Sequence, residues 1–367
     1  MQFFSTLKKN LSAVKNYQPG KPIEEVEREY GLKNAIKMAS NENAMGASPK
    51  ALAAIRKNLS KIYRYPDGGC FYLRNRLSKI LGVEGSQLVF GNGSDELLVL
   101  AVRAFVGESD EVIIADPTFL IYEIATQTES GHVVKVPMKN FHYDLTAMQA
   151  KINSRTKLIF IANPDNPVGT YVSKDQLAAF LKNVPSHVVV VLDEAYFEFA
   201  AAKKDYPDGI KFLSAYPNLL VTRTFSKAYG LAGLRVGYGV ADPAMINSLN
   251  KVREPFNVNL LAQVAALAAL DDTAHLKKSV KAVADGRAYL EKEFKRLKVR
   301  TIDTATNFIL ADLGVDAAPV YEKLLKSGVI VRPMGVWGLK TFIRVTIGKK
   351  AENERFIKNL NQILKGE

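Results

Sequence analysis

The chain has 367 residues, of which 47% are hydrophobic and 24% charged. These proportions are typical of a globular protein with a hydrophobic core, and they exclude a wholly disordered chain. The length allows two or three domains of ~100–200 residues each. Continuous apolar runs such as 188–192 and 265–270 are far shorter than the ~20 residues of a membrane-spanning helix. We therefore expect no membrane partner.

The chain carries 50 basic and 37 acidic residues, a net charge of +13. Such an excess can attract nucleic acid, a membrane surface or small anionic substrates. The basic residues are interleaved with acidic ones, as in segment 290–298, and no zinc-finger, basic-zipper or RNA-recognition signature is present. We therefore expect no nucleic-acid partner, and we interpret the charge as a solvated basic surface with a site for phosphorylated substrates.

Cysteine and histidine usage indicates the compartment and argues against a metal site. The single cysteine, Cys70, can form no intramolecular disulfide, which favours a reducing, cytoplasmic setting. Residues 1–9 show neither the apolar core nor the cleavage site of a secretory signal. The histidines lack metal-ligand spacing, so we expect no metal.

The middle of the chain alternates short β-branched segments with longer amphipathic ones. This pattern predicts a mainly parallel sheet with helices on both faces. The predicted strands are 87–90, 111–115, 132–136, 157–162, 187–193, 219–222 and 234–240. The predicted helices are 95–106, with a start at residue 94 or 95, then 120–126 and 174–182.

The last part of the chain has a different pattern. Residues 259–297 are helical in character, and four short strand-like segments follow them. These segments are 299–302, 307–311, 329–331 and 342–347, with a helix at 318–326. This block predicts a smaller α+β unit. Residues 1–45 are too polar to form a core alone, so we expect them to pack on a neighbouring part.

Polar side chains follow three successive predicted strands. Asn166 comes after strand 157–162, Asp193 ends the next strand, and Lys227 follows strand 219–222. Ligands of open α/β sheets bind beyond the carboxyl ends of the strands. The sequence therefore predicts that an amide, a carboxylate and an amine meet at one edge of the sheet.

This combination suits pyridoxal phosphate. Its aldehyde needs a lysine for a Schiff base, and its ring nitrogen needs a carboxylate to stay protonated. Asn166 and Tyr196 could donate to the 3-oxygen. The phosphate needs hydroxyls, an arginine and helix N–H groups, and the glycine-rich segment 91–96 supplies the helix start. That segment fits neither the dinucleotide fingerprint nor a Walker loop.

Segment 224–239, TFSKAYGLAGLRVGYG, closely resembles the cofactor-lysine motif of fold-type-I, pyridoxal-phosphate-dependent aminotransferases. In detail it is similar to their histidinol-phosphate aminotransferase group, in class II. The resemblance extends over nearly the whole chain, through motifs in the family's order. They are YQPG at 17–20, ASNEN at 39–43, RYPD at 64–67, GSDE at 93–96, PTF at 117–119, NPVG at 166–169, DEAY at 193–196 and IRVTIG at 343–348.

The resemblance implies roles for individual residues. Lys227 would be the Schiff-base lysine and proton shuttle, Asp193 would hold the ring nitrogen, and Tyr196 with Asn166 would bind the 3-oxygen. Further cofactor contacts would come from Phe119 on the ring and, at the phosphate, from Ser94, Asp95, Thr224, Ser226, Arg235 and Tyr65. Tyr65 would reach the phosphate of the partner subunit. Substrate would be bound by Tyr17, Asn43, Arg332 and Arg344.

The resemblance also implies the architecture and the reaction. We expect a large domain at 47–260 with a mostly parallel seven-stranded sheet. A small α+β domain would combine the N-terminal arm, 1–46, with the interdomain helix and C-terminal part, 261–367. Two subunits would share their active sites in a homodimer. The reaction would be transamination of L-histidinol phosphate with 2-oxoglutarate, an amino donor and a 2-oxo acid.

Other functions and simpler roles stay open at this point. Aromatic amino-acid aminotransferases and a threonine-phosphate decarboxylase share these motifs, and a non-catalytic regulatory module of the same fold is a different class. Lys227 and the lack of a helix-turn-helix segment before residue 40 disfavour that module. Taken alone, Asp193 also suits a helix N-cap, Phe119 a core position, Tyr65 an ordinary interface and Arg332 a surface ion pair.

Two positions depart from the family pattern. Ala44 stands where proline usually follows Asn-Glu-Asn, which loosens a loop at the substrate pocket. Val168 replaces the threonine of Asn-Pro-Thr-Gly and leaves Asn166 in place.

Overall fold

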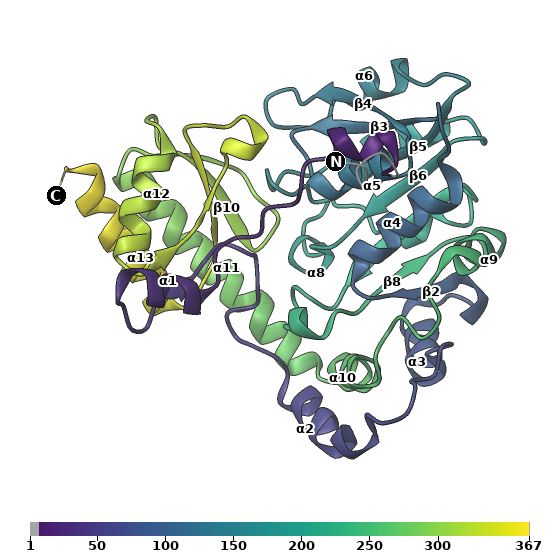
Figure 1. The fold of residues 1–367 in the computed structure, drawn as a ribbon, viewed down its shortest axis with the longest axis horizontal. Helices are drawn as coiled ribbons and strands as arrows, with labels where there is room; N and C mark the ends of the chain where they lie inside the picture. The colour runs from purple at the N-terminus through teal and green to yellow at the C-terminus, as the bar shows by residue number, and fades with distance from the viewer. Residues whose placement is uncertain (1–6, 367) are drawn as a thin grey trace.

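The computed structural model describes residues 7–366. Residues 1–6 lie outside the described residues; they belong to the predicted N-terminal arm and to the segment that was inspected for a secretory signal. Figure 1 shows a larger and a smaller part, connected by the long helix α11 (Thr273–Arg296) and by the N-terminal segment. Among the residues described, none of the helices combines the length and the hydropathy that a bilayer crossing requires.

The larger part contains a seven-stranded sheet in the order β2-β8-β7-β6-β5-β3-β4. Its strands are β2 (Leu88–Gly91), β3 (Glu111–Asp116), β4 (His132–Pro137), β5 (Thr156–Ala162), β6 (Val189–Asp193), β7 (Leu219–Thr224) and β8 (Gly237–Val240). Strand β8 runs antiparallel to β2 and β7, and the other pairings are parallel. The predicted seven-stranded, mostly parallel sheet is confirmed.

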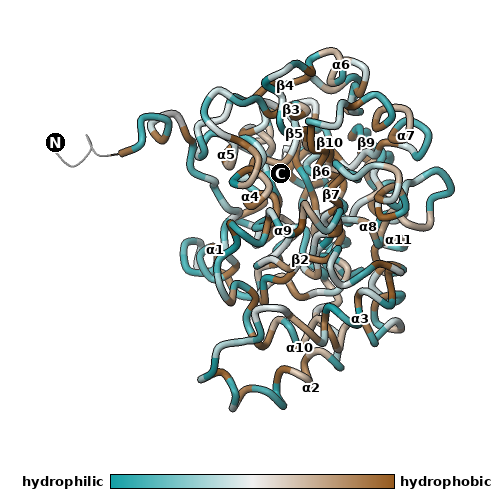
Figure 2. The backbone as a smooth tube through the Cα atoms, turned by 90° about the vertical axis from the view of Figure 1, so that its right-hand side faces the viewer, coloured by the Kyte–Doolittle hydropathy of each residue, from teal (hydrophilic) through white to brown (hydrophobic). Residues whose placement is uncertain are grey.

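Both faces of this sheet are buried, because side chains along a strand point alternately to opposite faces. On β5, Leu158 and Phe160 pack into one hydrophobic cluster, while Ile159 and Ile161 pack into another. In Figure 2 these central strands are coloured mainly as hydrophobic. The covering helices include α4 (Ser94–Phe105), α5 (Leu120–Thr128), α6 (Leu145–Ala150), α7 (Lys174–Lys182) and α9 (Pro243–Val252), whereas α8 (Phe197–Ala200) packs on α11.

Two predicted elements differ from those observed. The helical region 259–297 is two helices, α10 (Leu260–Leu270) and α11, because Asp272 caps the start of α11 by accepting the His275 N–H. Strand β8 begins at Gly237 rather than at 234, because Arg235 adopts a left-handed conformation with φ 54° that no strand continues through. Helix α10 packs on α2 (Pro49–Asn58) and α3 (Phe71–Leu81).

The smaller part contains a four-stranded antiparallel sheet in the order β12-β13-β10-β9. Its elements are β9 (Arg300–Ile302), β10 (Phe308–Asp312), α12 (Ala317–Lys326), β12 (Arg332–Pro333), the 3₁₀ turn η7 (Gly335–Trp337), β13 (Phe342–Thr346) and α13 (Lys350–Leu364). The predicted α+β unit is confirmed, and α13 was not predicted. Predicted strand 329–331 is β11 (Val329–Ile330), which pairs with β1 (Ile36–Lys37) outside this sheet. Helix α1 (Ile23–Tyr30) and β1 thus pack on the smaller part, whereas the 3₁₀ turn η2 (Lys9–Ala13) packs on α5 of the larger part.

Candidate active site

A cavity of about 400 Å³ lies at the carboxyl ends of β5, β6 and β7 and is closed on one side by the smaller part. Most of the predicted site residues line it. They are Tyr17, Ser94, Asp95, Phe119, Asn166, Asp193, Tyr196, Thr224, Ser226, Lys227, Arg235, Arg332 and Arg344. The two that do not are Asn43 and Tyr65.

Lys227 lies at this edge because β7, β6 and β5 are neighbours in the sheet, as the sequence predicted. Its Nζ donates a 3.3 Å hydrogen bond to the carbonyl of Ser40. Burial, reinforced by the guanidinium of Arg344, lowers the pKa of Lys227 to about 8. The lysine is therefore much closer to its neutral, nucleophilic form at neutral pH than a surface lysine.

Asp193 is held by three hydrogen bonds. Tyr122 donates its hydroxyl to Oδ2 at 2.9 Å, and the Thr222 hydroxyl and the Ala195 N–H reach Oδ1 at 3.3 Å and 3.2 Å. Burial raises the pKa of Asp193 to about 6, although these hydrogen bonds work in the opposite direction. Asp193 thus remains a carboxylate near neutral pH, poised to hold a cationic N–H group.

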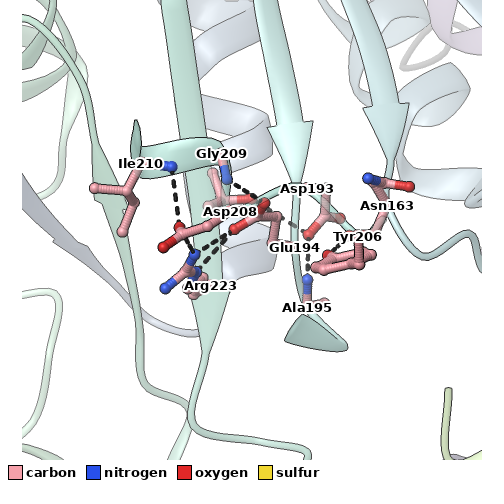
Figure 3. A network of polar contacts seen from close by, with 10 residues as sticks. Asn163, Asp193, Glu194, Ala195, Tyr206, Asp208, Gly209, Ile210 and Arg223 are labelled. Carbon is pink, nitrogen blue, oxygen red and sulfur yellow. Dashed lines mark hydrogen bonds and ion pairs between the residues drawn. The ribbon is translucent and has the colours of Figure 1, made fainter. Parts of the chain in front are cut away.

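Behind Asp193, a buried ion network joins the ends of β6 and β7 (Figure 3). Arg223 donates from Nε and Nη2 to one oxygen of Glu194, at 2.8 Å and 2.6 Å, and from Nη2 to Asp208 at 2.7 Å. The Gly209 N–H binds the second oxygen of Glu194. Because side chains alternate along a strand, Thr224, which lines the cavity, and Thr222, which donates to Asp193, lie on the face opposite Arg223.

The N-terminus of α4 contributes backbone donors to the cavity. The helix starts at Ser94, after Gly93, with no side-chain cap, so its first N–H groups stay available. A Cβ on Gly237 would lie 2.3 Å from the Ser94 nitrogen, so glycine is required there for the close approach of β8. Arg235 Nη1 lies 3.4 Å from the Ser226 hydroxyl in the same corner.

Two arginines enter the cavity from the smaller part, from positions paired in register on β12 and β13. Arg344 donates to the side-chain oxygen of Asn166 and to the carbonyl of Ala39. Its buried Nε has no partner among the described residues. Arg332 donates to the carbonyl of Gln18 at 2.6 Å.

Tyr196 lies between the two parts of the molecule. Its hydroxyl accepts a 2.9 Å hydrogen bond from the Asn41 side chain. Burial raises the Tyr196 pKa to about 12. The phenol therefore stays protonated and can donate to an anionic oxygen.

The side chain of Asn43 is hydrogen-bonded to other residues of the protein outside the cavity lining. It donates to the carbonyl of Ala228 and to the hydroxyl of Ser279, and so braces the loop after Lys227 against α11. Its side-chain oxygen accepts the N–H of Met45, so the turn around Ala44 closes without a proline. Sequence resemblance alone could not separate such bracing from substrate contact.

Tyr65 lies on the surface. Its side chain is 83% exposed, and its ring stacks on Phe256 at 4.8 Å. Cys70, its neighbour in the sequence, is buried and does not line the cavity.

Sequence reasoning missed three residues of the site. They are Tyr122, Asn41 and Trp337, which all line the cavity. Tyr122 is hydrogen-bonded to Asp193, and Asn41 is hydrogen-bonded to Tyr196. Phe119 is the N-cap of α5 and Tyr122 lies in its first turn, but no pattern in the sequence indicates the contact between Tyr122 and Asp193. Nothing in the sequence around Trp337 indicates its position.

The fold and the site define a class of protein. Residues 33–360 match the family of class I and II aminotransferases, and the chain belongs to that family. It is 50% identical over 355 residues to a histidinol-phosphate aminotransferase of Moorella thermoacetica, covering 96% of this chain and 92% of that one. It is 48% identical over 364 residues to histidinol-phosphate aminotransferase 2 of Pseudomonas fluorescens strain Pf-5. That match covers 99% of this chain and 98% of the relative.

Solved structures agree with the sequence relatives. The crystal structure of histidinol-phosphate aminotransferase from Sinorhizobium meliloti, in complex with pyridoxal-5'-phosphate, matches with a TM-score of 0.91 at 30% identity and covers 99% of this chain and 98% of its own. A Thermus thermophilus aspartate aminotransferase matches with a TM-score of 0.84 at 21% identity, covering 98% of this chain and 99% of its own, and shows the fold alone. The predicted resemblance and the fold-type-I class are confirmed.

Proposed function

We propose that this protein is a pyridoxal-phosphate-dependent transaminase of histidine biosynthesis. It converts L-histidinol phosphate and 2-oxoglutarate to imidazole-acetol phosphate and L-glutamate. The observation that carries this proposal is a single cavity in which Lys227 and Asp193 lie with two arginines from the smaller part. The names of the relatives at 50% and 48% identity support the choice of substrate.

The donor set of the cavity fits the cofactor. The uncapped start of α4, the Ser226 hydroxyl and Arg235 form an anion site of the kind that phosphates occupy. Lys227 offers an amine with lowered pKa, Asp193 a carboxylate, and Tyr196 a phenol. Ser94, Asp95 and Thr224 complete the phosphate site, and Phe119 and Asn166 bind the ring in this proposal.

When bound, pyridoxal phosphate supplies an aldehyde that takes up the amino group and a protonated ring that draws electrons from the substrate Cα. The protein's own groups do the rest. Lys227 Nζ removes the proton from Cα, for which its lowered pKa suits it. Asp193, fixed by Tyr122, keeps the ring nitrogen protonated, and Tyr196 donates to the ring's oxygen.

The cationic side of the cavity selects anionic substrates. Arg344 binds the α-carboxylate of glutamate or the phosphate of histidinol phosphate, and its Nε, which has no partner within residues 7–366, is a donor available to such a group. Arg332 is the second anion ligand, and Tyr17 contributes from the N-terminal arm. Asn43 takes part by holding the loop after Lys227.

The assembly is also part of the proposal. Segment 59–72 exposes a row of large apolar side chains, among them Ile62 at 64%, Tyr65 at 83% and Tyr72 at 75%, and such patches mark interaction surfaces. A second copy of the chain would cover them in a homodimer, with Tyr65 reaching the partner's cofactor phosphate. We propose the domain limits 1–46, 47–260 and 261–367 and a cytoplasmic location.

The decisive test is the visible absorbance of the protein with pyridoxal phosphate. We expect loss of the band of the bound cofactor on adding L-histidinol phosphate or L-glutamate, and little change with L-phenylalanine. Preferential loss with L-phenylalanine would assign an aromatic amino-acid substrate with the same chemistry. A folded protein that shows no cofactor band would contradict the proposal.

A further inference from the structure

Trp337 joins the two parts of the molecule at the active-site cavity. It ends the 3₁₀ turn η7 between β12 and β13 and lines the cavity. Its indole N–H donates a 2.8 Å hydrogen bond to the backbone carbonyl of Thr118, which belongs to the larger part. Thr118 directly precedes Phe119, which also lines the cavity.

The packing around Trp337 also comes from both parts. The indole packs in a small hydrophobic cluster with Met334 and Phe342, on either side of it in the chain, and with Val168. Val168 belongs to the turn that carries Asn166 in the larger part. The position of Trp337 is therefore sensitive to the separation of the two parts.

Trp337 also contacts one of the cationic groups of the cavity. The guanidinium carbon of Arg332 lies 5.5 Å from the centre of the indole ring, within the range of a cation–π interaction. Among the residues that the structure describes, the Arg332 side chain has one hydrogen-bond partner, the carbonyl of Gln18. An anion that binds the remaining donors of Arg332 therefore changes the electrostatic environment of the indole.

The hydrogen bond from Trp337 to Thr118 connects Trp337 to residues that pack around Asp193. Phe119 packs edge-on against Tyr122, with ring centres 5.7 Å apart. The Tyr122 hydroxyl in turn binds Asp193. A shift of the Thr118 carbonyl thus moves Phe119, while Asp193 keeps its further hydrogen bonds from Thr222 and Ala195.

We infer that Trp337 is a positioning residue that couples binding of the substrate's phosphate at Arg332 to the placement of Phe119. The inference rests on the proposed function for the identity of that phosphate. The contacts of Trp337 are with the Thr118 carbonyl and with Arg332, an anion ligand in the proposed site. We therefore expect its contribution in substrate binding, measured by KM, rather than in proton transfer by Lys227.

The first test uses the intrinsic fluorescence of the protein, because Trp337 is its only tryptophan. The holoenzyme is titrated with inorganic phosphate, with potassium chloride at matched ionic strength as the control. We expect a saturable change in tryptophan emission with phosphate alone, and its loss in the Arg332→Gln variant. An emission that does not respond saturably to phosphate, or responds equally in Arg332→Gln, overturns the inference.

The second test separates binding from chemistry. Trp337→Phe keeps an aromatic ring but removes the indole donor. We expect KM for L-histidinol phosphate to rise about threefold to tenfold, the effect of one hydrogen bond, with kcat unchanged within about twofold. The matched control is Val336→Ala, the 56%-exposed neighbour, which should leave both constants unchanged. A fall in kcat with KM unchanged overturns the role of Trp337.

The two tests keep this inference distinguishable from the proposed function. If the wild-type enzyme acts on L-phenylalanine and not on L-histidinol phosphate, the proposed function fails. The phosphate-dependent emission then still decides whether Trp337 senses an anion at Arg332.

Discussion

At the scale of single residues, the site depends on the charge states of two buried groups. Burial moves the pKa of Lys227 down to about 8 and that of Asp193 up to about 6. Both shifts have the same cause, since burial disfavours whichever form is charged. Between these two values Asp193 is ionised while a growing fraction of Lys227 is neutral, which is the combination that the chemistry needs.

The pKa of Asp193 gives a pH prediction. The affinity of the apoprotein for pyridoxal phosphate should fall as the pH drops through about 6, because a neutral Asp193 cannot hold a ring N–H cation. Removing the Tyr122 hydroxyl, which stabilises the carboxylate, should move this midpoint to higher pH. Absorbance titrations of wild type and Tyr122→Phe measure both midpoints.

The matched control is Tyr171→Phe, which removes a hydroxyl bound to the exposed Asp205 outside the cavity. Its midpoint should equal that of the wild type. A midpoint in Tyr122→Phe that stays in place or moves to lower pH would show that Asp193 is not the titrating group.

The residues that carry chemistry were predictable from sequence to different degrees. In the proposed site, Asn166, Asp193 and Lys227 could be located because each lies at or soon after the carboxyl end of a strand, and strand order brings such positions together. Tyr122 and Trp337 could not, because they act through contacts between segments far apart in the chain. Asn43 lies in a recognisable motif, yet its contacts are with Ala228 and Ser279.

At the scale of elements, the position of the N-terminus of α4 depends on the close approach of β8. A Cβ at Gly237 would lie 2.3 Å from the Ser94 nitrogen, a distance that requires the helix start or the strand to move. In the proposed function, the same backbone N–H groups contribute to the phosphate site of the cavity. Packing between these two elements therefore sets the geometry of cofactor binding.

We predict that Gly237→Ala weakens binding of pyridoxal phosphate by about tenfold or more, because overpacking of this kind costs about 1–3 kcal/mol. The dissociation constant is measured by titrating the apoprotein and following the cofactor absorbance. Gly233→Ala is the control, since its Cβ would meet no atom within 4 Å. Equal affinities for the two variants would exclude the close approach as a determinant.

Element boundaries were predictable where the periodic pattern was strong and local chemistry agreed with it. Helix α7 was predicted at its observed limits, because Ser173 and Gln176 form a capping box at its start. Strand β8 was predicted three residues early, because the apolar residues before Gly237 hide the left-handed turn at Arg235. The pairing of β11 with β1 depends on a contact between the two chain ends, which no local pattern encodes.

At the scale of the whole molecule, the exposed apolar row in segment 59–72 predicts a dimer. Ile62→Asp places a charge in this row and should shift the protein from dimer to monomer, because an unpaired charge is costly to bury. Sedimentation velocity measures the shift. Activity at dilute concentration should fall with it, since Tyr65 of each subunit serves the partner's site in the proposed dimer.

Val315→Asp is the control for this variant. Val315 is 51% exposed and lies just before α12 on the smaller part. It should leave the sedimentation coefficient unchanged. A wild-type protein that sediments as a monomer at all concentrations would contradict the shared-site proposal.

The pairing of β1 with β11 has a consequence for the synthesis of the chain. Ile36 is paired in register with Val329, so the two strands leave the ribosome almost three hundred residues apart. The larger sheet, complete at Val240, can form while the later residues are still being made. The segment that carries Ser40 and Asn41 must wait for the last quarter of the chain, so the cavity around Lys227 is among the last parts of the nascent protein to close.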